Sequence, residues 1–114
     1  MTLRMLPARE PTLDERRTAL IDRAVDDLAA HAHLTPRERE IARRLAHGAR
    51  GVEVCRELGL LRDTYKGHTR RLYAKTGTDD AEHWRAQVYT TVIRWLLEGS
   101  AHAPARARPK PVKR

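Results

Sequence analysis

The chain has 114 residues, enough for one small domain and its ends but with little room for a second hydrophobic core. Lysine and arginine outnumber aspartate and glutamate by 23 to 15, which gives a net charge of +8. No apolar run approaches the roughly 18 residues of a membrane span, and the N-terminus lacks the apolar core of a signal peptide. A single cysteine, Cys55, excludes an internal disulfide. We therefore expect a cytoplasmic protein with no membrane partner.

The positive charge is unevenly distributed along the chain. Residues 101–114 hold five basic residues and no acid, which leaves 18 of the 23 basic residues against 15 acidic ones in residues 1–100. Residues 1–100 thus have a net charge close to zero, although one helix within them is strongly basic. This distribution predicts a local contact with nucleic acid. The alternative interpretation is a basic surface that is simply solvated.

The first elements in chain order are an arm and an amphipathic helix. Residues 1–12 contain two prolines and no hydrophobic period, so we interpret them as a flexible arm. Residues 13–33 show apolar positions at helical spacing, with Thr12 as the N-cap and Glu15 at position N3. Six acids and three arginines in residues 10–33 give this helix the wrong sign for binding DNA. Its apolar stripe is expected to pack either on the rest of the chain or on a second copy.

The next helix has a strong start signal. Thr35 is suited to the N-cap, Pro36 to the first helical position, and Glu38 closes a capping box with Thr35. A second short helix is predicted over residues 52–58, and its length makes it stable only if it packs against something.

A basic helix follows, over about residues 63–75. Positions 62, 66, 70, 71 and 75 are all arginine or lysine, against the single acid Asp63. Tyr65 and Leu72, together with His68, are expected to face inward. Two helices joined by a short turn that contains glycine, the second basic on its exposed face, are typical of a helix-turn-helix.

Residues 34–77 read LTPREREIARRLAHGARGVEVCRELGLLRDTYKGHTRRLYAKTG. This stretch resembles the LuxR or GerE-type helix-turn-helix domain, whose pattern runs LTxREREVL, LAxG, a KEIAxxLG-like segment and TVKxHxxxIxxKL. The matching positions are Leu34, Thr35, Arg37, Glu38, Glu40, Leu45, Gly48, Glu53, Leu58, Gly59, Thr64, Lys66, His68 and Lys75. The resemblance implies an all-α fold with a four-helix DNA-binding domain, here extended by the N-terminal helix and a long C-terminal helix.

The chain departs from that family pattern at several positions. Arg50 and Leu61 stand where the family has serine or threonine as helix caps, and neither side chain can accept a hydrogen bond from a backbone N–H. Asp63 is therefore expected to act as a later cap and to start the basic helix one turn late. Tyr65 and Thr76 replace smaller or apolar residues, which predicts a differently filled interior with a buried hydroxyl that needs a partner.

The resemblance also assigns roles on the DNA. Three residues are expected to face base edges in the major groove: Lys66, Gly67 and Arg70. Phosphate contacts are expected from Thr64, His68, Arg71, Lys75, Arg50 and Arg62. Glu38 and Glu53 are expected to be structural.

The last predicted helix begins at Asp79 or Asp80 and ends at Glu98, within a DNA-binding domain predicted over residues 34–98. Its apolar stripe is wide for a small core, so it predicts a dimer contact, as the family resemblance also implies for this helix. The expected dimerisation residues are Trp84, Val88, Val92, Trp95 and Leu96. Residues 99–114 are rich in proline and basic residues, and we interpret them as a disordered basic tail.

Enzyme motifs, paired catalytic carboxylates and phosphate-binding glycine loops are absent from the sequence, so we expect neither an enzyme nor a cofactor. His31 and His33 lie two apart, which points them to different helix faces, and we expect no metal site. We expect no receiver or ligand-binding domain before the basic domain. The expected function is a stand-alone, dimeric, sequence-specific DNA-binding regulator. An adaptor that resembles region 4 of sigma factors and binds RNA polymerase or a sigma factor is the alternative.

Overall fold

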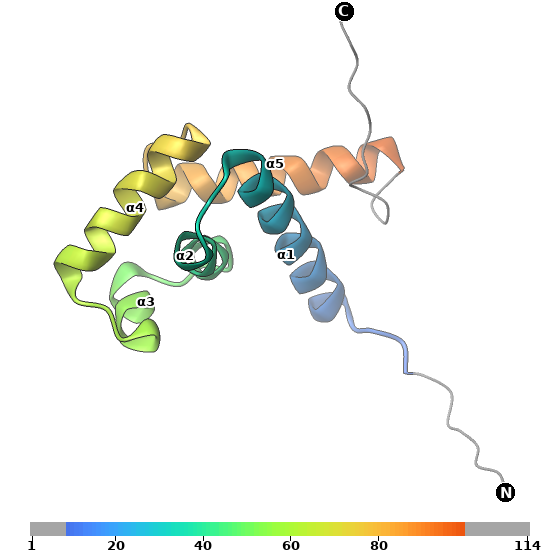
Figure 1. Cartoon of the computed structure of the whole chain (residues 1–114). Helices are drawn as coiled ribbons and strands as arrows, with labels where there is room; N and C mark the ends of the chain where they lie inside the picture. The colour runs from blue at the N-terminus through green and yellow to red at the C-terminus, as the bar shows by residue number, and fades with distance from the viewer. Residues whose placement is uncertain (1–8, 100–114) are drawn as a thin grey trace, which may run out of the picture.

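The computed structural model describes residues 9–99, which form five helices and no strand. The helices are α1 (Leu13–Ala32), α2 (Pro36–Ala46), α3 (Gly51–Leu58), α4 (Arg62–Thr76) and α5 (Ala81–Glu98) (Figure 1). The predicted all-α class is confirmed. Most of the predicted arm over residues 1–12, and all but the first residue of the predicted tail over residues 99–114, lie outside the described residues. None of the five helices is long and apolar enough to cross a membrane.

The first two helices begin where the sequence predicts. In α1, the Thr12 hydroxyl accepts a hydrogen bond from the Glu15 N–H at 3.0 Å, and the Glu15 carboxylate accepts one from the Thr12 N–H at 2.9 Å. Thr35 and Glu38 repeat the same reciprocal pair at the start of α2, at 3.1 and 3.0 Å. Each capping box satisfies two N–H groups that a helix start would otherwise leave without a partner.

The starts of α3 and α4 differ from the first two. Neither Arg50 nor Leu61 makes a side-chain cap hydrogen bond, as predicted. Glu53 partly compensates in α3, because its carboxylate accepts from the Arg50 N–H at 2.7 Å. The prediction that Asp63 would cap a late start of α4 is wrong. The helix begins at Arg62, and its first turn is closed by a hydrogen bond from the Tyr65 N–H to the Leu61 carbonyl at 2.9 Å.

Helix α2 is the centre of the fold and packs against each of the other four helices (Figure 1). Its side chains Ile41, Ala42, Leu45 and Ala46 are all buried. Helix α1 packs on α2 and α5 of the same chain, which decides between the two expectations for its apolar stripe. One continuous core results, and it is formed by Ile21, Ala24, Val25, Ala29, Leu34, Ile41, Ala42, Leu45, Ala46, Val54, Leu72, Trp84, Val88 and Trp95.

Helix α5 is fixed to α2 by two side-chain hydrogen bonds as well as by packing. The indole N–H of the fully buried Trp84 donates to the Ala42 carbonyl at 2.8 Å. The neighbouring Arg85 guanidinium donates to the Leu45 carbonyl at 2.9 Å. A buried indole N–H without such an acceptor would cost free energy, so this contact specifies how α5 lies across α2.

The dimerisation residues predicted on α5 require correction. Trp84 and Val88 are fully buried within this one chain, and Trp95 is only 8% exposed. Their aromatic and aliphatic surface needs no second copy to leave water, because α1 and α2 of the same chain pack against α5. Val92 is partly buried, and of the five predicted residues only Leu96 is mostly exposed, at 54%.

The acidic residues of α1 neutralise the basic residues of α2. Asp22 accepts a hydrogen bond from the His47 ring at 2.7 Å, and Asp26 lies 3.7 Å from Arg43 and 3.8 Å from Arg39. These pairs are partly exposed, so each contributes little to stability. Two of the acids of α1 thus face α2.

We expect Trp84→Phe to lower the free energy of unfolding by about 2–3 kcal/mol, because it removes buried volume and the hydrogen bond to Ala42. Trp95→Phe is the matched control, since Trp95 lies at the edge of the core. Urea denaturation followed by circular dichroism measures both. Equal losses would show that the indole hydrogen bond of Trp84 contributes nothing measurable.

Candidate nucleic-acid interface

A row of basic side chains follows the exposed face of α4. Arg62, Lys66 and Arg70 are four residues apart, which places them on adjacent turns, and all three are exposed. None of them forms an ion pair with an acidic residue within the described range 9–99, whereas Arg9, Arg16, Arg17, Arg37, Arg39, Arg43, Arg44 and Arg71 do. We call Arg62, Lys66 and Arg70 the basic row.

Repulsion among the positive charges of the basic row destabilises α4 in the isolated chain. Like charges four residues apart destabilise a helix by roughly 0.2–0.5 kcal/mol per pair. The row has one acid beside it, Asp63, which lies in the first turn of α4, where a negative charge is favoured. An external anion would offset the repulsion.

The opposite face of α4 packs on the core. Leu72 is fully buried and Tyr65 is half-buried, so both face inward as predicted. Thr69 is also buried, which the sequence analysis missed, and its hydroxyl donates to the Lys66 carbonyl of its own helix at 3.1 Å. Thr76, where a buried hydroxyl was predicted, is only partly buried, and its hydroxyl donates to the Leu72 carbonyl at 2.9 Å and lies 2.9 Å from the hydroxyl of the buried Thr78.

Two predicted phosphate contacts, Arg71 and Lys75, meet a carboxylate of the chain itself. The Lys75 ammonium donates to Glu38 Oε1 at 2.8 Å and lies 3.4 Å from the His33 carbonyl oxygen. The Arg71 Nε lies 3.5 Å from Glu38 Oε2. The Glu38 side chain is only 2% exposed, so these two cations neutralise a buried negative charge. We call Glu38, Arg71 and Lys75 the Glu38 cluster.

The Glu38 cluster separates the roles of its two cations. The Lys75 ammonium is held against Glu38 and the end of α1, a geometry that fits a structural role and not the predicted phosphate contact. Arg71 remains 57% exposed, and its guanidinium also lies 3.4 Å from the half-buried His68 ring. Arg71 and His68 therefore remain accessible to an anion at the side of α4, whereas the Lys75 ammonium already has Glu38 as its partner.

The charge state of Glu38 follows from these contacts. Burial alone raises the pKa of this carboxyl, but the hydrogen bonds from the Lys75 ammonium and the Thr35 N–H outweigh it, together with the charges of Lys75 and Arg71. The net effect is a pKa below the ordinary value of 4.5. Glu38 is therefore ionised at neutral pH and holds both cations.

Helix α3 is positioned against α4 by a contact between glycine and tyrosine. A Cβ atom at Gly51 would lie 3.0 Å from the Tyr65 hydroxyl and 3.1 Å from its ring. A side chain at Gly51 would require the Tyr65 ring to shift slightly. Tyr65 also borders a groove of about 300 Å³ with Cys55, which is half-buried and carries a free thiol. Arg50, at the start of α3, is exposed, as are Thr64 and Asp63 on α4.

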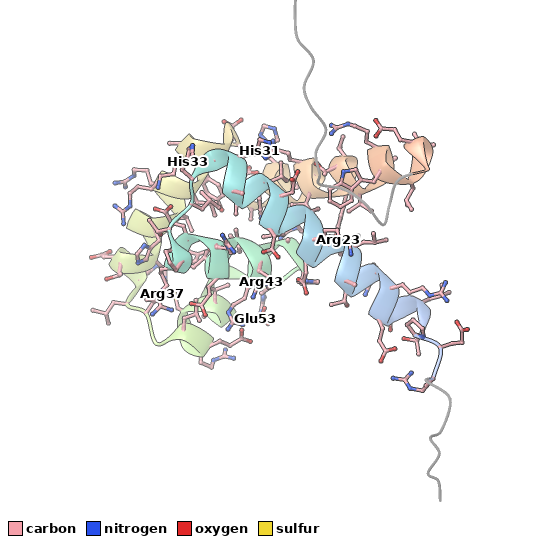
Figure 2. All side chains as sticks on the ribbon, turned by 45° about the vertical axis from the view of Figure 1, so that its right-hand side comes forward. Arg23, His31, His33, Arg37, Arg43 and Glu53 are labelled. Atoms are coloured by element: carbon pink, nitrogen blue, oxygen red, sulfur yellow. The ribbon has the colours of Figure 1, made fainter. Side chains whose placement is uncertain are left out.

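His31 and His33 lie together at the end of α1 (Figure 2). The His31 ring contacts the Asp27 carbonyl oxygen of its own helix at 2.9 Å. His33 adopts a left-handed backbone conformation, with φ of 58°, that ends the helix. Among residues 9–99 no group of three or more histidine, cysteine, aspartate or glutamate side chains is placed to hold a metal ion.

We expect Glu38→Gln to lower the free energy of unfolding at pH 7 by about 1–3 kcal/mol, because the amide keeps the cap but not the charge that binds Lys75 and Arg71. A carboxyl with a lowered pKa contributes stability above its ordinary pKa, and this contribution is lost as the pH falls through the lowered value. The difference between wild type and variant should therefore shrink below pH 4.5. Urea denaturation at several pH values measures it.

The chain contains its own control for that measurement. Glu15→Gln alters an equivalent capping box on the surface of α1, where the carboxylate pairs with the exposed Arg9. Its effect at pH 7 should be clearly smaller than that of Glu38→Gln. Equal effects would mean that capping, and not the buried ion pair, accounts for the role of Glu38.

Comparisons of the chain with models of protein families, with curated proteins and with solved structures find no match.

Proposed function

We propose that the chain is a sequence-specific regulator of transcription that binds double-stranded DNA as a dimer in the cytoplasm, with α4 in the major groove and no catalytic activity. The observation that carries this proposal is the basic row. Arg62, Lys66 and Arg70 stand in line on an exposed helix face and have no acidic partner in the described chain. A helix of this kind matches the width and the charge of the major groove.

The order and packing of α3 and α4 support the same proposal. The two helices are joined by a short turn that contains Gly59, and they pack against each other and against α2. This is the arrangement that a helix-turn-helix requires. The sequence resemblance to the LuxR or GerE-type domain points in the same direction and gives α4 the role of recognition helix.

The proposed contacts fall into two groups. Lys66, Gly67 and Arg70 face base edges. The phosphate contacts come from Arg50, Arg62, Thr64, His68 and Arg71. Lys75 is omitted from the second group because it pairs with Glu38, and its part is to fix the orientation of α4.

Selection from a pool of random-sequence duplexes tests the proposal directly. The full chain should enrich a common sequence, and its affinity for that sequence should fall linearly with salt on a logarithmic scale. Failure to enrich any sequence would contradict sequence-specific binding. If the chain instead bound purified RNA polymerase or a sigma factor without DNA, the adaptor function would replace it.

We expect Arg70→Ala to weaken binding to the selected duplex by about 1–3 kcal/mol and binding to random duplexes much less, because a base contact is lost. Arg94→Ala is the matched control: it removes the same charge from an exposed position on α5 and should leave the preference unchanged. Fluorescence anisotropy with both duplexes measures the two variants. Equal losses on both duplexes for Arg70→Ala would assign Arg70 to phosphate.

Gly67 offers a second test, because no contact within the chain requires a glycine there. A Cβ atom at this position would meet only the Arg71 guanidinium nitrogens, at 3.8 Å. Gly67→Ala should therefore stabilise the helix by roughly 0.5–1 kcal/mol. If α4 lies against bases, the added methyl group should lower DNA affinity in the same variant. Thermal denaturation and anisotropy would then move in opposite directions, and an unchanged affinity would show that no base approaches Gly67.

A further inference from the structure

The first part of α1 extends beyond the body of the molecule. Every residue from 13 to 19 is exposed, and Leu13 is 82% exposed. The last turns of α5 extend in the same way, with Ile93 and Leu96 each 54% exposed. In both views these two ends diverge from each other on the side of the molecule away from α4 (Figures 1 and 2).

An apolar groove of about 510 Å³ lies between the two diverging ends. Both walls are formed by aliphatic and aromatic side chains, which include Leu13, Leu20, Ile21, Tyr89, Ile93 and Leu96. Contiguous exposed apolar surface of this kind marks an interaction site in soluble proteins. We call this surface the outer groove.

The charges around the outer groove indicate the kind of partner. Its charged lining residues, Arg16 and Arg17, are each close to an acid of the same chain, Glu10 at 3.3 Å and Asp14 at 3.7 Å. The rim therefore carries both signs in balance, unlike the basic row on α4. Such a rim favours neither DNA nor a strongly charged protein, and it is complementary to a copy of itself related by a twofold axis.

The shape of the outer groove also favours a second copy of the chain as the partner. Each side of the outer groove is the end of a single amphipathic helix, and an apolar groove between two helices accepts a third helix with an apolar face. The chain itself supplies such a helix in α1 and in α5. When two copies interlock, each inserts a helix end into the outer groove of the other, so that both exposed surfaces are covered at once.

We propose that the outer groove is the interface of a symmetric dimer, in which the ends of α1 and α5 from two copies form a four-helix bundle. This inference deepens the proposed function by identifying the surface that joins the two DNA-binding units. It assigns the dimer contact to exposed residues of α1 and α5 in place of the buried Trp84 and Val88. The ends of α1 and α5 that line the groove lie on the side of the molecule away from α4 (Figure 1), so dimer formation leaves the basic row free.

Sedimentation equilibrium of the full chain without DNA tests the interface. The wild type should be a dimer at micromolar concentration. Leu13→Glu and Ile93→Glu should each raise the dimer dissociation constant at least about tenfold, because each buries a carboxylate in the apolar contact. Both side chains are mostly exposed in the single chain, so both variants should keep the wild-type helical circular dichroism.

Leu61→Glu is the matched control, because Leu61 is 77% exposed but lies before α4, outside the outer groove. It should leave the dissociation constant unchanged. A monomeric wild type would overturn the proposal and assign the groove to a different partner. If the wild type is a dimer but neither Leu13→Glu nor Ile93→Glu weakens it, the outer groove is not the dimer interface. No step uses DNA, so a failure of the proposed DNA binding would not alter the result.

Discussion

The buried carboxylate of Glu38 determines how α4 lies on the rest of the molecule. Its oxygens accept from the Thr35 N–H at the start of α2 and from the Lys75 ammonium near the end of α4, and Lys75 also reaches the His33 carbonyl at the end of α1. A buried charge without partners would cost several kcal/mol, so other orientations of α4 that separate these groups are disfavoured. Glu38 and Lys75 together thus join three helix ends and orient the helix that carries the basic row.

This arrangement divides the cations of α4 by the side on which they lie. Lys75 and, in part, Arg71 neutralise Glu38, whereas Arg62, Lys66 and Arg70 have no acidic partner in the described chain. The elements behind α4 show the opposite pattern, because Asp26 of α1 pairs with Arg39 and Arg43 of α2. Acidic residues thus accompany basic ones where α1 meets α2 and are scarce on the exposed face of α4. The net charge of +8 alone could not show this separation.

Local signals in the sequence were sufficient for the all-α class and for the starts of α1 and α2, because a capping box is complete within four residues. Contacts between residues far apart in the sequence cannot be predicted from such local signals. The period of α5 predicts a wide apolar stripe but cannot show that α1 and α2 of the same chain cover part of it, which is why the sequence places Trp84 and Val88 in a dimer contact. Lys75 carried one usable signal, since it lies three residues after the buried Leu72 and hence beside the inward face. Its partner Glu38 lies 37 residues away, beyond the reach of a helical period.

The uncovered ends of α1 and α5 follow from the way the helices cross. At about 1.5 Å per residue, the 18 residues of α5 extend about 27 Å, and α2 crosses α5 instead of running along it, so the last turns of α5 extend beyond α2 (Figure 1). Helix α1, with 20 residues, diverges from α5 instead of running along it, so it cannot cover the excess (Figure 1). The core is complete without Ile93, Leu96 and Leu97, which remain 54–83% exposed. Folding of the single chain therefore gives no reason for apolar residues at these positions, whereas contact with a second copy does.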